Sequence, residues 1–342
     1  MVATLEDTKR QAIGMKLADM KALQNLLIAN EQLFINSCND SELCDCFRDM
    51  LEDDRKNMGV LETVIVQYGV QSEPNETTTK MIKEVQKLME GSELTMFEKV
   101  GQHELLKHKQ TMAGLLVHKA AQVVGADIEA AITPLNTVNF ENRAHQEQLK
   151  GVLEILGVRE LTGKDPDQGV WARVQDAMAA MSGIIGGAVT RTKDEMNITE
   201  IITMDHRKVD TLFMEIEKTD DSQKLQEFFG QLYKDLSVHA EAEEQIVYPA
   251  IRSYYGDTQE LYDEQAEMKQ MLSQIKGLNP SNSNFKEQIK QLKTAVQDHV
   301  RQEENDMFPQ IRRNLSEAQM EQMATQFKAA KNTIQQKMAG MS

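Results

Sequence analysis

Proline, cysteine and aromatic residues are scarce in this chain. Its 342 residues include 6 prolines, 3 cysteines and 1 tryptophan, and aromatic side chains make up 5% of it, whereas methionine occurs 21 times. Few helix breakers and few strand-favouring aromatics predict an almost entirely helical chain. The length exceeds that of one average domain and predicts two.

The three cysteines, Cys38, Cys44 and Cys46, are too few and too close together for a disulfide framework. An odd number without a C-x-x-C spacing fits reduced thiols in a cytosolic protein better. A zinc or redox role for Cys44 and Cys46 is an alternative, but small buried side chains on a helix explain them more simply.

The chain also lacks long apolar runs and a basic balance of charge. Its first residues, MVATLEDTKR, are polar, and no apolar run approaches the thickness of a bilayer, so we expect a cytoplasmic protein without a membrane partner. There are 38 Lys and Arg against 54 Asp and Glu, a net charge of −16. Because phosphate binding needs clustered Lys and Arg, this balance predicts no nucleic-acid partner.

Apolar residues recur at helical spacing through the N-terminal half. Glycines and Pro74 mark its loops, a break is expected near Gly91, and Pro134 should bend or stop a helix. The sequence predicts a four-helix bundle at 1–182 with helices at 5–36, 41–68, 76–124 and 126–156 and a short one at 170–182, then a linker at 183–196.

Four further helices are predicted in the C-terminal half, at 197–218, 222–253, 257–277 and 283–313. They form a second four-helix bundle over 197–315. Ser316 can cap a last amphipathic helix, 316–342, whose methionine-rich stripe should dock on one of the bundles or on a second subunit as a homodimer. The stripe consists of Met320, Met323, Phe327, Ile334 and Met338.

One segment of the C-terminal half is repeated sixty positions later. HAEAEEQIVYPAIR begins at His239 and HVRQEENDMFPQIR begins at His299, so Glu243 corresponds to Glu303. Residues four apart share one face of an α-helix, so each copy sets an imidazole beside a carboxylate. Two such helices facing each other could hold two metal ions.

A second pair of segments repeats at an offset of fifty-nine, but one position differs. Residues 205–216 align with 264–275, and Val209 falls on Met268, which keeps the apolar spacing. His206, however, falls on Gln265. The region therefore has two similar halves that differ at one candidate ligand.

These motifs resemble the hemerythrin-like (HHE cation-binding) domains over roughly residues 197–315. His206, the two H-x-x-x-E pairs, and the aromatic–proline steps Tyr248-Pro249 and Phe308-Pro309 carry the resemblance. It implies a four-helix bundle that binds non-haem iron. The family usually has a histidine in the third helix, where this chain has Gln265.

The chemistry of the residues assigns a role to each candidate ligand. We expect Glu243 and Glu303 to bridge two cations, and His239, His299 and His206 to be terminal ligands. Gln265 is a weak ligand through its amide oxygen, or leaves an open position for dioxygen, nitric oxide or water. Iron fits this set, and manganese or zinc also does. Two acids next to the bridging residues, Glu244 and Glu304, lie off the metal-facing stripe and are solvated or support the ligands. The alternative is a bundle without metal that keeps a hydrogen-bonded His–Glu network.

The N-terminal bundle carries one inward acid per helix and resembles a ferritin-like bundle. The acids are Glu31, Asp54, Glu104 and Glu141. Where that family has E-x-x-H, this chain has Asp54-x-x-Asn57 and Asn142-x-x-His145, and Glu31 and Asp54 should lie about two helical turns apart. We expect a metal-free polar remnant formed by Glu31, Glu104, Glu141 and His145.

The resemblance implies a non-haem iron protein, di-iron or mono-iron, that senses or handles dioxygen, nitric oxide, peroxide or iron. No acid–base or nucleophilic group stands out apart from the ligands, so any catalysis would be centred on the metal. Two alternatives are a di-iron oxidase or peroxidase and a metal-free helical scaffold with decayed sites.

Overall fold

The computed structural model describes residues 8–166 and 196–340, and those residues form helices and connecting loops without a strand. The prediction of an all-α protein is confirmed. The short helix expected at 170–182 and nearly all of the linker expected at 183–196 lie outside the described residues. None of the described helices combines the length and the apolar character needed to cross a bilayer.

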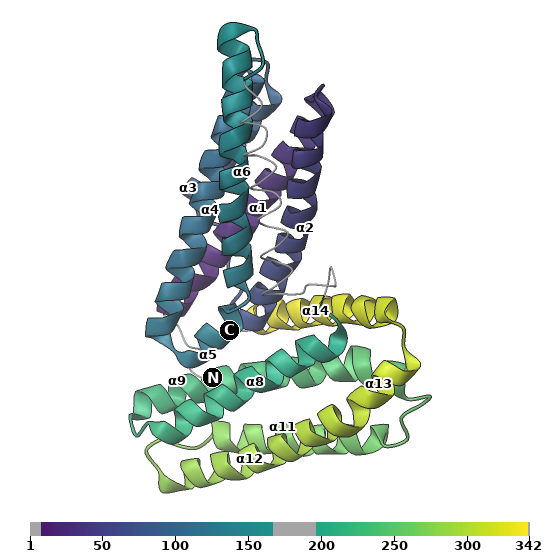
Figure 1. The fold of residues 1–342 in the computed structure, drawn as a ribbon. Coiled ribbons are helices and arrows are strands. Elements are labelled where there is room, and N and C mark those ends of the chain that lie inside the picture. Colours follow the sequence, from purple (N-terminus) through teal and green to yellow (C-terminus); the bar gives the residue numbers. More distant parts are fainter. Residues whose placement is uncertain (1–7, 167–195, 341–342) are drawn as a thin grey trace.

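The N-terminal half is built from long antiparallel helices (Figure 1). The expected break near Gly91 is confirmed, since Gly91 follows one helix and Thr95 caps the next through a capping box with Glu98. Pro134 separates two helices, as its missing N–H predicts. The helices are α1 (Thr8–Ser37), α2 (Ser41–Tyr68), α3 (Glu76–Glu90), α4 (Met96–Val124), α5 (Ala126–Ile132) and α6 (Leu135–Thr162).

The C-terminal half is a second bundle, which lies across the end of the first (Figure 1). Its helices are α8 (Ile198–Lys218), α9 (Ser222–Ala242), α10 (Tyr248–Ile251), α11 (Thr258–Lys276), α12 (Ser283–Gln302), α13 (Phe308–Asn314) and α14 (Glu317–Gly340). Two five-residue π-helical turns, η1 (Glu243–Val247) and η2 (Glu303–Met307), join α9 to α10 and α12 to α13. Pro249 and Pro309 follow these turns, because proline cannot donate the hydrogen bond that a continuous α-helix requires.

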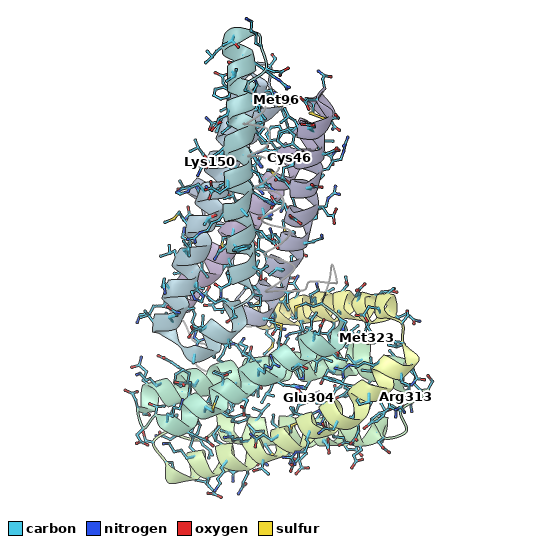
Figure 2. The ribbon with its side chains drawn as sticks, in the orientation of Figure 1. Cys46, Met96, Lys150, Glu304, Arg313 and Met323 are labelled. Carbon is cyan, nitrogen blue, oxygen red and sulfur yellow. A yellow bond between two sulfur atoms is a disulfide. The ribbon has the colours of Figure 1, made fainter. Side chains whose placement is uncertain are left out.

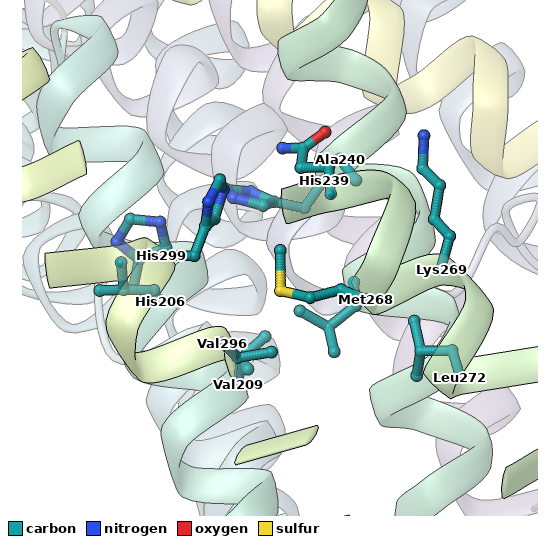
Figure 3. Close-up of a pocket in the computed structure, with 12 residues that line it drawn as sticks. His206, Val209, His239, Ala240, Met268, Lys269, Leu272, Val296 and His299 are labelled. Carbon is teal, nitrogen blue, oxygen red and sulfur yellow. The ribbon is translucent and has the colours of Figure 1, made fainter. Parts of the chain in front are cut away.

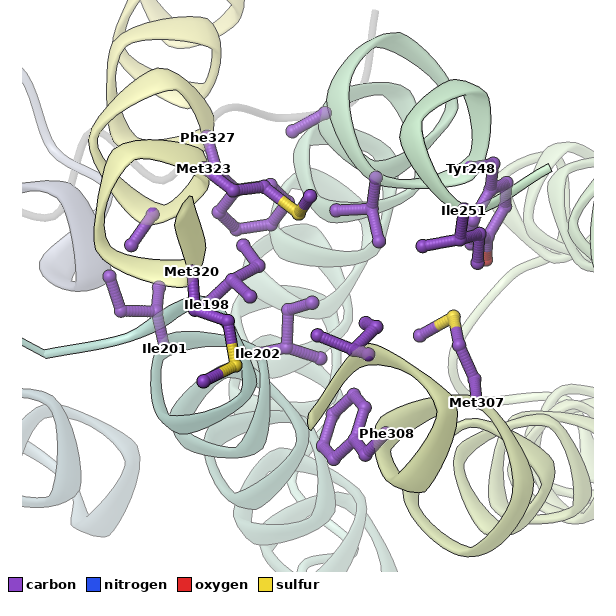
Figure 4. Close-up of a cluster of buried hydrophobic side chains, with 14 of the residues drawn as sticks. Ile198, Ile201, Ile202, Tyr248, Ile251, Met307, Phe308, Met320, Met323 and Phe327 are labelled. Atoms are coloured by element: carbon purple, nitrogen blue, oxygen red, sulfur yellow. The ribbon is translucent and has the colours of Figure 1, made fainter. Parts of the chain in front are cut away.

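Two hydrophobic clusters fill the C-terminal bundle. The α14 cluster gathers side chains from α8, α10, α13 and α14 (Figure 4), among them Ile198, Ile202, Tyr248, Ile251, Phe308, Met320, Met323 and Phe327. The α12 cluster fills the other end with Val209, Leu212, Phe213, Leu236, Met268, Leu272, Phe285 and Val296, among others. Each cluster buries several large apolar side chains, which stabilises the bundle.

The methionine-rich stripe of α14 packs against the bundle of its own chain. Met320, Met323 and Phe327 are buried in the α14 cluster, and Lys331 makes a buried ion pair with Asp205 of α8 at 2.6 Å. In Figure 2, Met323 lies at the contact between α14 and the bundle. The stripe thus docks on a bundle of its own chain, one of the two alternatives expected for it, and the homodimer stays a prediction.

Polar contacts join the two halves. Lys208 of α8 donates to the backbone oxygens of Gln67 and Tyr68 near the end of α2, and forms an ion pair with Asp235 at 3.0 Å. From α14, Gln335 donates to the backbone oxygen of Val66 at 2.9 Å. Because these acceptors are carbonyls at the end of a helix, the contacts satisfy groups that the helix itself leaves unbonded.

The expectation of three reduced cysteines is wrong for two of them. Cys38, in the turn between α1 and α2, is joined by a disulfide to Cys44 in the first turn of α2, with Cα atoms 5.8 Å apart. The short turn brings the two residues within the span of a disulfide, which spacing in the sequence alone did not reveal. Cys46 stays a thiol inside the bundle (Figure 2), and burial raises its pKa to about 12.

Candidate metal centre

Four buried side chains from different segments meet between the α14 cluster and the α12 cluster. Each of His206, His239, Glu243 and Glu303 offers one ligand atom, and these atoms lie within 4.8 Å of one another. His206 comes from α8, His239 from α9, and the two glutamates open the π turns. The set of two imidazoles and two carboxylates suits a first-row transition metal.

Each candidate histidine is oriented by a carboxylate that bonds to its outer nitrogen. The Nδ1 atom of His206 lies 2.8 Å from Glu304, that of His239 lies 3.0 Å from Asp205, and that of His299 lies 2.6 Å from Glu264. A carboxylate at Nδ1 fixes the tautomer that leaves Nε2 as a lone-pair donor. The three imidazoles are therefore held ready to ligate.

Several of the inward atoms lack a hydrogen-bond partner although they are buried. Nε2 of His206 lies 3.2 Å from Oε2 of Glu303, yet neither atom makes a well-oriented hydrogen bond, and Oε1 of Glu243 also lacks a partner. Because buried polar atoms are nearly always satisfied, their grouping fits a metal ion as the common partner.

The charged groups of the centre shift one another's pKa values. Burial and the neighbouring Glu303 raise the pKa of Glu243 well above its usual range. Burial opposes ionisation of Glu303 too, but the charges of His299 and His206 prevail and hold its pKa well below that range. Burial disfavours the imidazolium of His206, whereas Glu303 and Glu304 raise its pKa to about 9. A divalent cation would replace these protons as the neutralising charge.

The two remaining predicted ligands lie on the other side of the glutamates, around Tyr248. Nε2 of His299 is 3.4 Å from Glu303 Oε1 and 3.3 Å from the hydroxyl oxygen of Tyr248. Gln265 donates its amide nitrogen to Glu243 at 2.7 Å and to the Tyr248 hydroxyl at 2.6 Å. The structure thus presents a hydrogen-bond donor of Gln265, not its oxygen, to the carboxylates.

Tyr248 was not among the predicted site residues. Burial, together with Glu243 and Glu303, raises its pKa well above the usual value, so it keeps its proton. The repeat contains the signal that could have revealed it, because Tyr248 aligns with Phe308 and is the only one of that pair with a hydroxyl.

A small cavity lies beside the imidazoles. Its volume is about 30 Å³, and it is lined by His206, His239 and His299 at one end and by Val209, Met268 and Leu272 at the other (Figure 3). This volume accommodates a water or a diatomic molecule.

Of the two outer acids, Glu304 bonds to His206, whereas Glu244 pairs with Lys269 at 2.6 Å.

The N-terminal bundle contains a buried polar cluster whose membership differs from the expected one. The ammonium of Lys107 lies 3.0 Å from Glu31, 2.5 Å from Asp54 and 2.9 Å from Nδ1 of His145. His103 bonds to Glu31 at 3.2 Å. The Lys107 ammonium thus lies between the carboxylates that could otherwise have bound a metal cation.

One of the residues expected in that remnant has another partner. Glu104 accepts from Gln146 at 3.2 Å. The expectation that Glu31 and Asp54 are two turns apart is wrong, because one ammonium contacts both. Side chains lean toward the N-terminus of their helix, so on antiparallel neighbours these two carboxylates lean toward each other.

Comparisons with known proteins agree with the metal-binding character of the C-terminal bundle. Residues 197–311 match the family model described as the hemerythrin HHE cation binding domain. An uncharacterized hemerythrin-like protein of Schizosaccharomyces pombe is 28% identical over 142 residues, 40% of this chain and 70% of that protein. No solved structure matches the chain. A ferritin-like relationship of the N-terminal bundle is not among these findings.

A relative along the whole length contradicts one expectation. A protein of Nostoc sp. (strain PCC 7120) named "DNA nickase" is 62% identical over 346 residues, which cover 100% of this chain and 99% of that protein. The expectation of no nucleic-acid partner, drawn from the net charge of −16, is therefore wrong. A net charge averages over the whole surface and does not describe the local charge of one face.

Proposed function

The chain belongs to the family of the Nostoc protein named "DNA nickase", and we propose that it is a metal-dependent DNA-nicking protein whose hemerythrin-type bundle binds iron. The observation that carries this proposal is the 62% identity, which extends over both halves of the chain. Nicking is the breaking of one strand of a duplex. The cluster of His206, His239, Glu243 and Glu303 supports the metal requirement.

A metal ion bound at this cluster would supply Lewis-acid or redox chemistry toward a small molecule in the adjoining cavity, which the side chains themselves lack. The two imidazoles and two carboxylates hold it, and the outer carboxylates of Asp205 and Glu304 keep the imidazoles oriented. Iron is the favoured metal because the domain is of the hemerythrin type, and manganese and zinc are the comparators.

Access to the centre is limited to small molecules. The ligand side chains are buried, and the adjoining cavity of about 30 Å³ is far too small for a DNA backbone. The metal ion would therefore not coordinate the scissile phosphodiester. DNA contacts the outside of the protein, and the metal requirement that we propose acts through the metal-bound state of the protein.

The outer face of α4 is our candidate for the DNA contact. Residues 105–126 contain no acidic residue, although the chain as a whole has 54. His108, Lys109 and Lys119 are exposed there, and neither lysine pairs with a carboxylate of the described residues. A local stretch of positive charge without acids is what a phosphate backbone requires.

A plasmid assay tests the proposal. Protein loaded anaerobically with Fe(II) is expected to convert supercoiled plasmid into open circles, and metal-free protein is not. Glu303→Gln should lose the metal and the nicking, whereas Glu287→Gln, an exposed control on α12, should keep both. Nicking by metal-free protein at the full rate would refute the metal requirement, and no nicking under either condition would refute the activity.

The DNA contact is tested separately in the same assay. Lys109→Glu with Lys119→Glu should lower nicking at least tenfold at low salt and leave the iron content unchanged, because the loss of phosphate contacts weakens binding. Lys224→Glu with Lys290→Glu, at exposed positions on α9 and α12, makes the same change of charge away from α4 and should have little effect. Equal effects of the two substitutions would contradict a contact at α4.

A second candidate function is the handling of a small oxygen or nitrogen compound, and the cavity favours it. Three imidazoles line one end of a space that fits a diatomic molecule, and apolar side chains line most of the rest, together with Gln265 and Lys269. Nitric oxide added to the Fe(II)-loaded protein should change its optical spectrum if the cavity admits ligands to the metal. An unchanged spectrum would count against this function.

A further inference from the structure

Two of the aligned positions at which the halves of the repeat differ lie at the metal centre, and the residues there contact each other in pairs. His206 aligns with Gln265, and Phe308 aligns with Tyr248. In the structure, Phe308 stacks on His206, with ring centroids 6.3 Å apart and planes inclined by 5°. On the other side of the centre, Gln265 donates to the Tyr248 hydroxyl at 2.6 Å. A histidine–phenylalanine pair on one side thus becomes a glutamine–tyrosine pair on the other.

The π turns explain why these aromatic residues reach the centre. In a continuous α-helix, the residue four positions after Glu243 would follow it on the inward face. The π turn adds one residue. Tyr248, five positions after Glu243, therefore points inward, and its hydroxyl donates to Oε2 of Glu243 at 3.3 Å. The second turn likewise directs Phe308 inward.

The hydroxyl of Tyr248 lies close to the three candidate ligand atoms on the Gln265 side of the centre. Its oxygen is 2.8 Å from Glu303 Oε1, 3.3 Å from Glu243 Oε2 and 3.3 Å from His299 Nε2. These two carboxylates and this imidazole would be the ligands of a second metal ion. On the opposite side, Phe308 has no hydroxyl, and Nε2 of His206 remains without a hydrogen bond.

We propose that the centre binds one metal ion, at His206, His239, Glu243 and Glu303, and that Tyr248 and Gln265 fill the position of the second. The phenol proton and the amide N–H satisfy the carboxylate oxygens on that side, as a cation would. A metal there would have to displace a buried hydroxyl and leave the amide nitrogen facing positive charge. This inference rests on the metal binding in the proposed function but not on the nicking activity.

Metal counting on paired variants tests it. Wild-type protein loaded with Fe(II) should contain one iron per chain. The double substitution Tyr248→Phe, Gln265→His places a histidine–phenylalanine pair on this side of the centre, as on the other side. The iron content should then rise to two per chain. The mirror control, Phe308→Tyr with His206→Gln, should lower it from one to none. Circular dichroism establishes that each variant is folded.

Loading with Mn(II) provides a second readout that does not depend on counting. An isolated ion in the wild type should give the six-line electron paramagnetic resonance spectrum of a single Mn(II), and the variant with two histidine–phenylalanine pairs should give the broadened spectrum of a coupled pair. Two metals in the wild type would overturn this inference and leave the proposed function intact. A folded Tyr248→Phe, Gln265→His variant that still binds one metal would also overturn it. No metal in the wild type would refute the metal binding that both proposals need.

Discussion

Replacement of Lys107 by methionine should destabilise the N-terminal bundle strongly, because it leaves two buried carboxylates without their cation. The Lys107 ammonium lies 3.0 Å from Glu31 and 2.5 Å from Asp54, and all three side chains are fully buried. Removal of one partner from a buried ion pair costs about 3–5 kcal/mol in the free energy of unfolding. Since two acids depend on this one lysine, we expect a loss at the upper end of that range at pH 8.

The loss should shrink as the pH falls. Burial raises the pKa of Glu31 and of Asp54 even with the lysine present, and without it both values rise further. Protonation then removes the uncompensated charge, and each unit of pKa corresponds to about 1.4 kcal/mol. At pH 5 we expect the destabilisation by Lys107→Met to be smaller than at pH 8 by at least about 1 kcal/mol.

Hydrogen exchange measured by mass spectrometry is the suitable assay, because peptides from α1 and α4 report the N-terminal bundle separately from the rest. Lys150→Met, at an exposed position on α6 (Figure 2), is the matched control and should change the stability by less than about 0.5 kcal/mol. Lys107→Met combined with Glu31→Gln and Asp54→Asn should regain most of the loss. A change below about 1 kcal/mol for Lys107→Met, or one independent of pH, would refute the reasoning.

Three other predictions concern titration and the metal centre. Burial and the Lys107 charge lower the pKa of His103 to about 3. The unfolded chain protonates this imidazole near pH 6.5, whereas the folded chain does not. The free energy of unfolding therefore falls by about 1.4 kcal/mol per pH unit as the pH drops from 6.5 toward 3. His103→Gln should remove this part of the slope in urea unfolding measured from pH 7 to pH 5, and an unchanged slope would contradict it. Asp205→Asn weakens the support of His239 and should lower metal affinity about 10–100-fold by isothermal titration, whereas an unchanged affinity would count against this role. Metal at a hundredfold excess over Kd should stabilise the C-terminal bundle by about 2.7 kcal/mol in thermal unfolding, and an unshifted transition would argue against binding to the native state.

The helices and their ends were largely predictable because local chemistry determines them. The break at Gly91, the stop at Pro134 and the four helices after residue 197 follow from glycine, proline and apolar spacing. The π turns and the position of Tyr248 were not predicted, since an extra residue in a helix turns every later side chain. A comparison of Tyr248 with Phe308 in the repeat would have pointed to it.

The polar interior of the N-terminal bundle shows the limit of reasoning from the sequence. Apolar spacing indicates which acids lie on inward stripes but does not indicate Lys107, because a lysine is rarely buried unless it is paired. Its partners Glu31 and Asp54 come from helices whose relative height depends on packing and on side-chain direction. The proposed action on DNA is not visible in the net charge either, because the acid-free stretch of α4 is averaged with the rest of the chain.

Anomalous X-ray diffraction at the iron absorption edge, on crystals of the Fe(II)-loaded chain, tests the metal centre most directly. We expect one strong peak among Nε2 of His206, Nε2 of His239 and the carboxylates of Glu243 and Glu303. The absence of a peak there, or a peak only at another place in the protein, would contradict the assignment of this bundle as the metal centre.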